Sequence, residues 1–196
     1  MTFIVEIFPG LREMMNLHPV WVHFPIAFLS VFFLVDLLAA VFRSRALFVV
    51  ANWLLGLGAL GAVVAAAFGL QAALTVPHPP QVHEILETHR YFALNATALA
   101  WLLLIWRLLN RGRFWLVGRL FHSLLALFMV LNLMLAADYG GLMVYKHGVG
   151  VKAVPAWPPG ASGHRHGSAW DELREWMHEI IPHSHAPGHE HHHHAH

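Results

Sequence analysis

Four long, unbroken apolar runs constrain this chain more than any other feature of its sequence. Each run has about the length of the roughly 20 helical residues that cross the apolar core of a bilayer. Because lipid offers the backbone no hydrogen-bond partners, such runs can only form helices. The sequence therefore predicts an all-α integral membrane protein, a four-helix bundle. The runs are Val20 to Phe42, Ala46 to Leu74, Tyr91 to Leu109 and Trp115 to Ala137.

Composition agrees with a membrane protein and excludes several kinds of chemistry. Only 12% of the residues are charged, about half the fraction typical of a soluble domain. The chain has no cysteine, which excludes disulfides, iron–sulfur clusters, thiolate catalysis and covalently attached c-type haem. No basic cluster indicates nucleic acid as a partner. No nucleophile–base set or phosphate-binding glycine loop indicates an enzyme, so we expect a non-catalytic redox or binding subunit.

The chain divides into five segments. Residues 1–19 form an external or interfacial lead-in, and residues 20–151 form the bundle. A Pro/Gly linker covers residues 152–167. The next segment, 168–182, has the apolar stripe of an amphipathic helix, which we expect to lie on the membrane or on the bundle. Residues 183–196 are a His-rich tail.

The distribution of arginine predicts the orientation, because short loops rich in Lys and Arg stay in the cytoplasm. Arg43 and Arg45 separate the first two runs, and four more arginines flank the turn between the last two. The segment from Thr75 to Arg90 contains two Glu and only one Arg. Both Arg-rich turns are therefore assigned to the cytoplasm, and both termini to the periplasmic side of a bacterial inner membrane.

Histidines gather on one side of the predicted bundle. Six lie at external helix ends or in the external loop, whereas His122 alone belongs to the cytoplasmic half of the bundle. Ionisable residues that share one depth in a membrane are functional-site candidates, because their burial is costly. The six are His18, His23, His78, His83, His89 and His147.

His23 and His89 form the pair best suited to a cofactor. His23 lies about one turn inside the first helix, and His89 opens the third helix, which descends from the same side. Two imidazoles on facing helices of an apolar bundle are typical of a bis-histidine b-type haem. The alternative is that these histidines are interfacial caps at helix ends, which is the preferred interpretation for His78 and His83.

His18 and His147 are expected as substitute ligands or supporting groups. His18 precedes His23 by five positions, about 140° around a helix, so both cannot point at one ligand. His147 follows the fourth run and reaches the same external zone. Because His122 has no histidine partner on its side, any cofactor should be confined to the external leaflet.

Three further expectations concern the helices themselves. Pro25 should kink the first helix, and Gly148 with Gly150 should end the fourth. Asp36 lies deep in the first helix and needs a partner. We expect a structural ion pair with Arg119 or His122 near the cytoplasmic face.

The tail offers a separate metal-binding hypothesis. Eleven histidines lie from His164 onward, and imidazole at this density binds zinc, copper or nickel. The spacing defines no single tetrahedral site, so a loose divalent-metal buffer or sensor is the most that it supports. The histidines of the final segment are His183, His185, His189, His191, His192, His193, His194 and His196.

Two motifs resemble a bacterial family of four-helix membrane proteins, catalogued as domain of unknown function 2231. They are His18-Pro-Val-Trp-Val-His-Phe-Pro-Ile-Ala27 and Gly140-Gly-Leu-Met-Val-Tyr-Lys-His-Gly-Val-Gly-Val151, and the resemblance covers about residues 16–151. His89 also matches the family pattern, whereas Asp138 stands where the family often has a histidine. Related domains occur fused to Rieske-type or cytochrome c-type modules, so the resemblance implies a membrane redox partner.

These observations lead to a preferred hypothesis and two rivals. The preferred function is a membrane electron-transfer subunit that holds one b-type haem between His23 and His89 and exchanges electrons with a respiratory or periplasmic redox protein, or with a quinol. The first rival is a periplasmic-side protein that handles a divalent metal ion, and the second is a structural subunit without a cofactor.

Overall fold

The computed structural model describes residues 7–110, 116–151 and Arg174. The chain divides into two compact units, Met1–Ala153 and Val154–His196. Apart from Arg174, the second unit lies outside the described residues. The predicted linker, amphipathic helix and metal-binding tail, residues 152–196, therefore lie outside the described residues except for Arg174.

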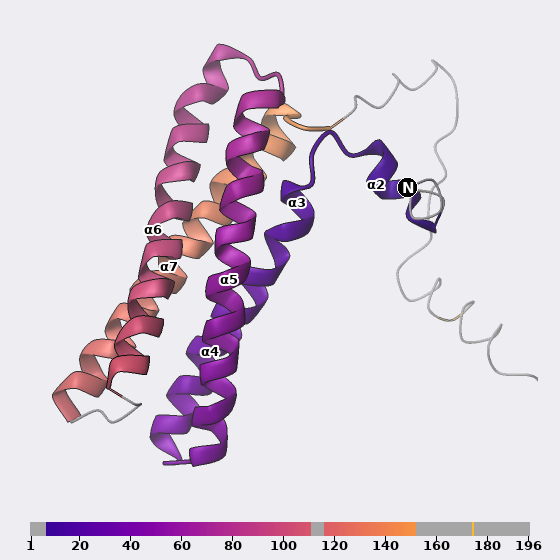
Figure 1. Ribbon diagram of the computed structural model, residues 1–196. Helices are drawn as coiled ribbons and strands as arrows, with labels where there is room; N and C mark the ends of the chain where they lie inside the picture. The colour runs from indigo at the N-terminus through magenta and orange to yellow at the C-terminus, as the bar shows by residue number, and fades with distance from the viewer. Residues whose placement is uncertain (1–6, 111–115, 152–173, 175–196) are drawn as a thin grey trace, which may run out of the picture. The chain divides into compact units, whose positions relative to one another are not determined.

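The described part of the chain is all-α, with no strand, and contains four helices long and apolar enough to cross a membrane, as predicted (Figure 1). A short helix, α2 (Pro9–Glu13), precedes them, and a 3₁₀ turn, η1 (Pro80–Val82), leads into the third. The spans are formed by α3 (His18–Trp21) with α4 (His23–Val41), α5 (Arg45–Thr75), α6 (His83–Leu109) and α7 (Leu116–His147).

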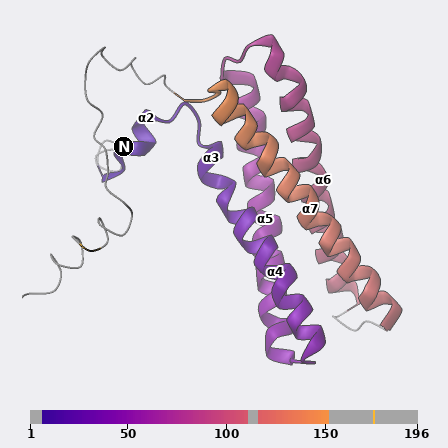
Figure 2. The ribbon, with the colours of Figure 1, turned by 180° about the vertical axis from the view of Figure 1, so that it is seen from behind.

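Each long helix runs antiparallel to the next, which is the arrangement that short connections favour. The α4 helix packs most closely on α5, and α6 on α7, so the bundle consists of two helical hairpins. Contacts of α5 with α6 and of α4 with α7 close the ring, and Figure 2 shows α7 crossing between α4 and α6 on the far side. Hence α4 and α6 are diagonal partners, as are α5 and α7.

The helices extend further toward the α5–α6 connection than hydropathy indicates. The α6 helix begins at His83, so the expected external loop is shortened by about two turns of helix. The α7 helix continues to His147 and stops at Gly148 (φ 64°) and Gly150 (φ 76°), as predicted from the glycine pair. The predicted disturbance near Pro25 is a break between α3 and α4 at Val22.

The two hairpins repeat one another with an offset of 71 residues. The buried positions Pro25, Leu29, Phe32 and Asp36 of α4 correspond to the buried Ala96, Ala100, Leu103 and Arg107 of α6. The buried Ala51, Leu55, Gly58, Ala59, Ala62 and Ala65 of α5 correspond to His122, Ala126, Met129, Val130, Leu133 and Ala136 of α7.

Several equivalent residues also contact each other across the bundle. The rings of His18 and His89 lie 6.0 Å apart, and Asp36 bonds to Arg107. A residue meets its own equivalent only near a two-fold axis. The two hairpins are therefore related by an approximate two-fold axis along the bundle. We call the end with His18 and His89 the histidine end, and the end with Asp36 and Arg107 the charged end.

Candidate cofactor site

The histidine end brings one imidazole from each hairpin to the middle of the bundle. His18 is the first residue of α3, and His89 lies in the second turn of α6. Their ring centroids are 6.0 Å apart and the ring planes are perpendicular. Both side chains are partly buried. We call these two residues the histidine pair.

The two rings are held in the same way. The Nδ1 atom of His18 lies 3.0 Å from the carbonyl oxygen of Ala65, and the Nδ1 atom of His89 lies 2.8 Å from that of Ala136. Both bonds span 47 residues. Because a carbonyl only accepts hydrogen bonds, each Nδ1 must carry the proton and donate it. In the neutral rings, both Nε2 atoms are then left with a lone pair.

A glycine lies beside each ring. A Cβ atom built on Gly69 would come within 2.9 Å of the His18 ring, and one built on Gly140 within 3.3 Å of the His89 ring. A side chain at either position would therefore displace the imidazole or the helix. The two glycines are also equivalent by the 71-residue offset, so the ring, its carbonyl and its glycine form a half-site that occurs twice.

An apolar cavity of about 380 Å³ adjoins the histidine pair. It is lined by residues of α3, α5, α6 and α7, of the α5–α6 connection, and of the segments just before α3 and just after α7. This size falls in the range of small-molecule and cofactor sites. Most of its lining is aliphatic, and the Asn16 side chain in the lining also accepts a hydrogen bond from the backbone N–H of His18 at 3.0 Å. Its polar lining residues are Asn16, His18, His78, His89 and Arg90.

Other histidines predicted for this zone lie elsewhere. His23 is exposed and does not face His89, which differs from the predicted pairing. His18 and His23 lie on opposite sides of the break at Val22, and of the two it is His18 whose ring lies beside that of His89. His147 is partly buried at the end of α7 but does not line the cavity. His78 lines it, stacked 6.3 Å from the exposed His83.

The charged end holds a buried ion cluster. The Nη2 atom of Arg107 lies 2.7 Å from Oδ1 of Asp36, and both side chains are only 2% exposed. Arg119 donates to the backbone oxygen of Asp36 at 2.7 Å and lies 3.1 Å from Oδ1. Nδ1 of His122 is 3.7 Å from Oδ2. The predicted partners Arg119 and His122 are thus confirmed as neighbours, whereas the closest partner, Arg107, was missed.

Aromatic rings stabilise the two arginines of this cluster. The guanidinium carbon of Arg107 lies 4.1 Å from the ring centroid of Phe48 and 5.5 Å from that of Phe32, and Arg119 lies 5.8 Å from Phe48. Such cation–π contacts gain strength when water is excluded. Asp36 belongs to the first hairpin and both arginines to the second. The cluster therefore ties the two hairpins together.

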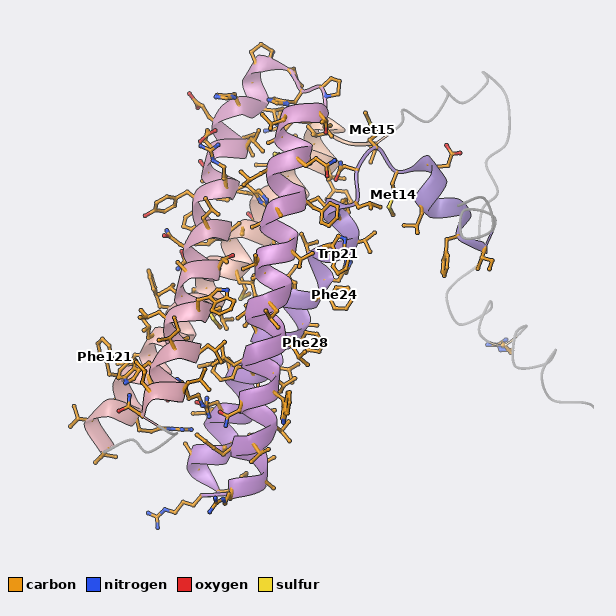
Figure 3. All side chains as sticks on the ribbon, viewed as in Figure 1. Met14, Met15, Trp21, Phe24, Phe28 and Phe121 are labelled. Atoms are coloured by element: carbon orange, nitrogen blue, oxygen red, sulfur yellow. The ribbon has the colours of Figure 1, made fainter. Side chains whose placement is uncertain are left out.

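A row of aromatic rings runs down the outside of the first hairpin (Figure 3). Trp21 stacks on Phe68 at 5.7 Å, and Trp21, Phe24 and Phe28 follow one another at 5.5 and 6.2 Å. In Figure 3, Phe121 lies at the charged end, on α7. The row packs α3 and α4 against α5 close to the histidine pair.

Fold and site together define a class: a four-helix integral membrane protein with an apolar cavity lined in part by two equivalent histidines. The family model described as "Predicted membrane protein (DUF2231)" matches residues 14–153, and the chain belongs to this family. No curated protein and no solved structure matches the chain. The match covers the bundle and the segments that line the cavity.

Proposed function

We propose that this protein is a membrane electron-transfer subunit that binds one b-type haem at the histidine end, with His18 and His89 as its axial ligands. The observation that carries the proposal is the pair of imidazoles, 6.0 Å apart, each with Nδ1 bonded to a backbone carbonyl and Nε2 left as an acceptor. Two hydrogen-bond acceptors cannot bond each other. An electron-pair acceptor between them, such as a metal ion, would satisfy both.

The separation of the rings supports a single metal ion between them. Metal–imidazole bonds of ~2.0–2.1 Å, plus about 1 Å from each nitrogen to its ring centre, put two such rings roughly 6 Å apart. The observed centroid separation is 6.0 Å. The Nδ1–H bonds to backbone carbonyls fix the tautomer and orientation of both rings, as is usual for metal-ligating histidines.

The number of donors favours porphyrin-bound iron over a bare divalent ion. Within the residues that the structure describes, no group of three or more His, Cys, Asp or Glu side chains is arranged to hold a metal ion. A structural zinc site needs about four protein ligands. Iron in a porphyrin receives four nitrogens from the macrocycle, so two axial imidazoles complete its coordination.

The surroundings suit a cofactor that exchanges single electrons. Haem would supply a reversible one-electron couple. The aliphatic lining would exclude water from it, and the carbonyls of Ala65 and Ala136 would hold both rings while the charge changes. Arg90 is the last charged residue of α6 before the apolar stretch, so the site lies near the membrane boundary. On the orientation predicted from arginine, this is the periplasmic side, where a redox protein or a quinol could reach it.

The first experiment is a dithionite-reduced minus oxidised visible spectrum of the detergent-purified protein, with iron analysis on the same sample. We expect a sharp α-band, a shifted Soret peak and about one iron per chain. A featureless, iron-free sample from haem-replete cells would end the haem proposal. Stoichiometric zinc, copper or nickel in that sample would favour divalent-metal handling instead.

A further inference from the structure

Arg90 is the one permanently charged side chain among the described residues that line the cavity. It follows His89 directly and belongs to the same turn of α6. Most of its neighbours in the lining are aliphatic. A cation on the rim of an apolar cavity offers an anionic group of a bound molecule a partner that the aliphatic lining lacks.

The ion pair that Arg90 makes does not use up its guanidinium. Its Nη2 atom lies 2.6 Å from Oε2 of Glu87, three residues earlier on the same helix, and the two side chains are 47% and 42% exposed. Exposed pairs of this kind contribute at most about 1 kcal/mol. A guanidinium has five N–H donors, and the structure gives Arg90 this single hydrogen bond. The remaining donors are available to a ligand.

The two hairpins each contribute a histidine to the cavity, but only one of them contributes a charged side chain to its described lining. By the 71-residue offset, His18 corresponds to His89, whereas Arg90 corresponds to Pro19, which also lines the cavity. A molecule without charge would meet nearly the same axial environment in either orientation. A molecule with an anionic edge would meet a cation on only one side, and would therefore bind in one orientation.

We propose that Arg90 binds a carboxylate of the cavity's ligand, so that the site selects a flat apolar molecule with an anionic edge and fixes its orientation. This inference rests on the proposed haem function and names the haem propionates as the groups that Arg90 binds. Because Arg90 directly follows His89, it would place a positive charge beside a bound haem. That charge would favour the reduced form, which carries one positive charge fewer.

The test compares haem with its dimethyl ester, in which both carboxylates are neutral. Each is titrated into the full-length protein from haem-deficient cells, and binding is followed by visible absorption. We expect Arg90→Gln to weaken haem binding about tenfold, the size of one charge-assisted hydrogen bond, and to leave binding of the ester unchanged. Arg45→Gln, an exposed arginine at the charged end, is the matched control and should affect neither. The midpoint potential of haem-loaded Arg90→Gln should be lower than that of the wild type.

The outcomes separate this inference from the function on which it rests. If wild-type protein binds neither probe, the haem proposal fails and takes the role of Arg90 with it. If wild-type protein binds haem and Arg90→Gln binds it equally well at an unchanged potential, the inference alone is overturned. If the variant loses affinity for haem and ester alike, Arg90 shapes the cavity or binds a lipid phosphate, and the carboxylate role is wrong. Arg90→Lys, which keeps the charge, should retain the potential.

Discussion

The histidine end and the charged end of the bundle place equivalent residues on the same two-fold axis, with opposite results. At the charged end, the equivalent residues are Asp36 and Arg107, which bond each other directly at 2.7 Å. At the histidine end, they are two imidazoles whose Nδ1 protons are already donated to carbonyls. Asp36 and Arg107 satisfy each other and tie the two hairpins together, whereas the two imidazoles leave an Nε2 lone pair each, which the proposed cofactor would use. The comparison teaches that a two-fold axis can place a self-sufficient ion pair at one end of a bundle and two like electron-pair donors at the other.

The largest expected effect is loss of the cofactor at the histidine end without loss of the fold. His18→Ala and His89→Ala should each reduce haem to background, because each removes half of the axial ligation. Haem per chain, measured from the reduced spectrum, is the readout, and the stability of the bundle in denaturing detergent should change little. His83→Ala, an exposed histidine outside the cavity, serves as the control. Normal haem content in both His18→Ala and His89→Ala would refute the assignment.

The charged end should show the converse behaviour. Asp36→Asn leaves the buried Arg107 and the partly buried Arg119 without their carboxylate, and removal of one partner from a buried pair costs about 3–5 kcal/mol. We expect a large drop in the free energy of unfolding, measured by denaturing detergent, while molecules that remain folded keep their haem. The matched test is the exchange variant Asp36→Arg with Arg107→Asp. Because the two positions are equivalent across the axis, exchange should recover part of the loss. Recovery of nothing would argue that Arg119 dominates the cluster.

The glycines offer a graded perturbation of the histidine end. Gly69→Ala places a methyl group 2.9 Å from the His18 ring, and Gly140→Ala one at 3.3 Å from the His89 ring. Overpacking of this kind costs about 1–3 kcal/mol, so we expect weaker haem binding, about tenfold or more for Gly69→Ala and less for Gly140→Ala. Haem titration of both variants measures which of them binds haem more weakly. Gly56→Ala, which meets open space, should match the wild type, and a reversed order would mean that the ring positions are wrong.

The smallest expected effect decides which histidine of the first hairpin is the ligand. His23 is exposed, and the ring that lies beside His89 is that of His18. His23→Ala should therefore keep its haem and change the free energy of unfolding by no more than about 0.5 kcal/mol. A visible spectrum of the purified variant measures its haem content, and unfolding of the same preparation in denaturing detergent measures its stability. Loss of haem in this variant, with haem retained in His18→Ala, would restore the pairing expected from sequence.

The number of helices could be predicted from sequence because each segment that crosses the lipid must itself be apolar, whatever the rest of the chain does. Hydropathy misplaced some helix ends, because it records the water boundary and a helix can continue past it. The polar residues from His83 to Arg90 are the example, since they form the first turns of α6. The end of α7 was predictable because glycine at positive φ is a local signal.

The rotation of a helix about its axis could not be predicted, because it depends on neighbours distant in sequence. The choice between His18 and His23 is of this kind. So is Arg107, which by charge alone belongs to a cytoplasmic turn but is 3% exposed and bonds to Asp36. The internal repeat could not be predicted from sequence for a related reason. Equivalent positions in the two hairpins share burial and small size, but few of them carry identical residues. The identical pairs include His18 with His89 and Gly69 with Gly140.

The separation of Asp36 and Arg107 along the chain has a consequence for how the protein is made. The first hairpin leaves the ribosome before its partner exists, and at roughly 5–20 residues per second Arg107, 71 positions after Asp36, follows several seconds later. During that interval an unpaired Asp36 in α4 costs on the order of 3 kcal/mol in the membrane. A pause in translation after α5 would prolong this vulnerable stage and expose the nascent hairpin to quality-control proteases. A pause after the second hairpin has entered the membrane would be harmless, since both arginines could by then reach Asp36.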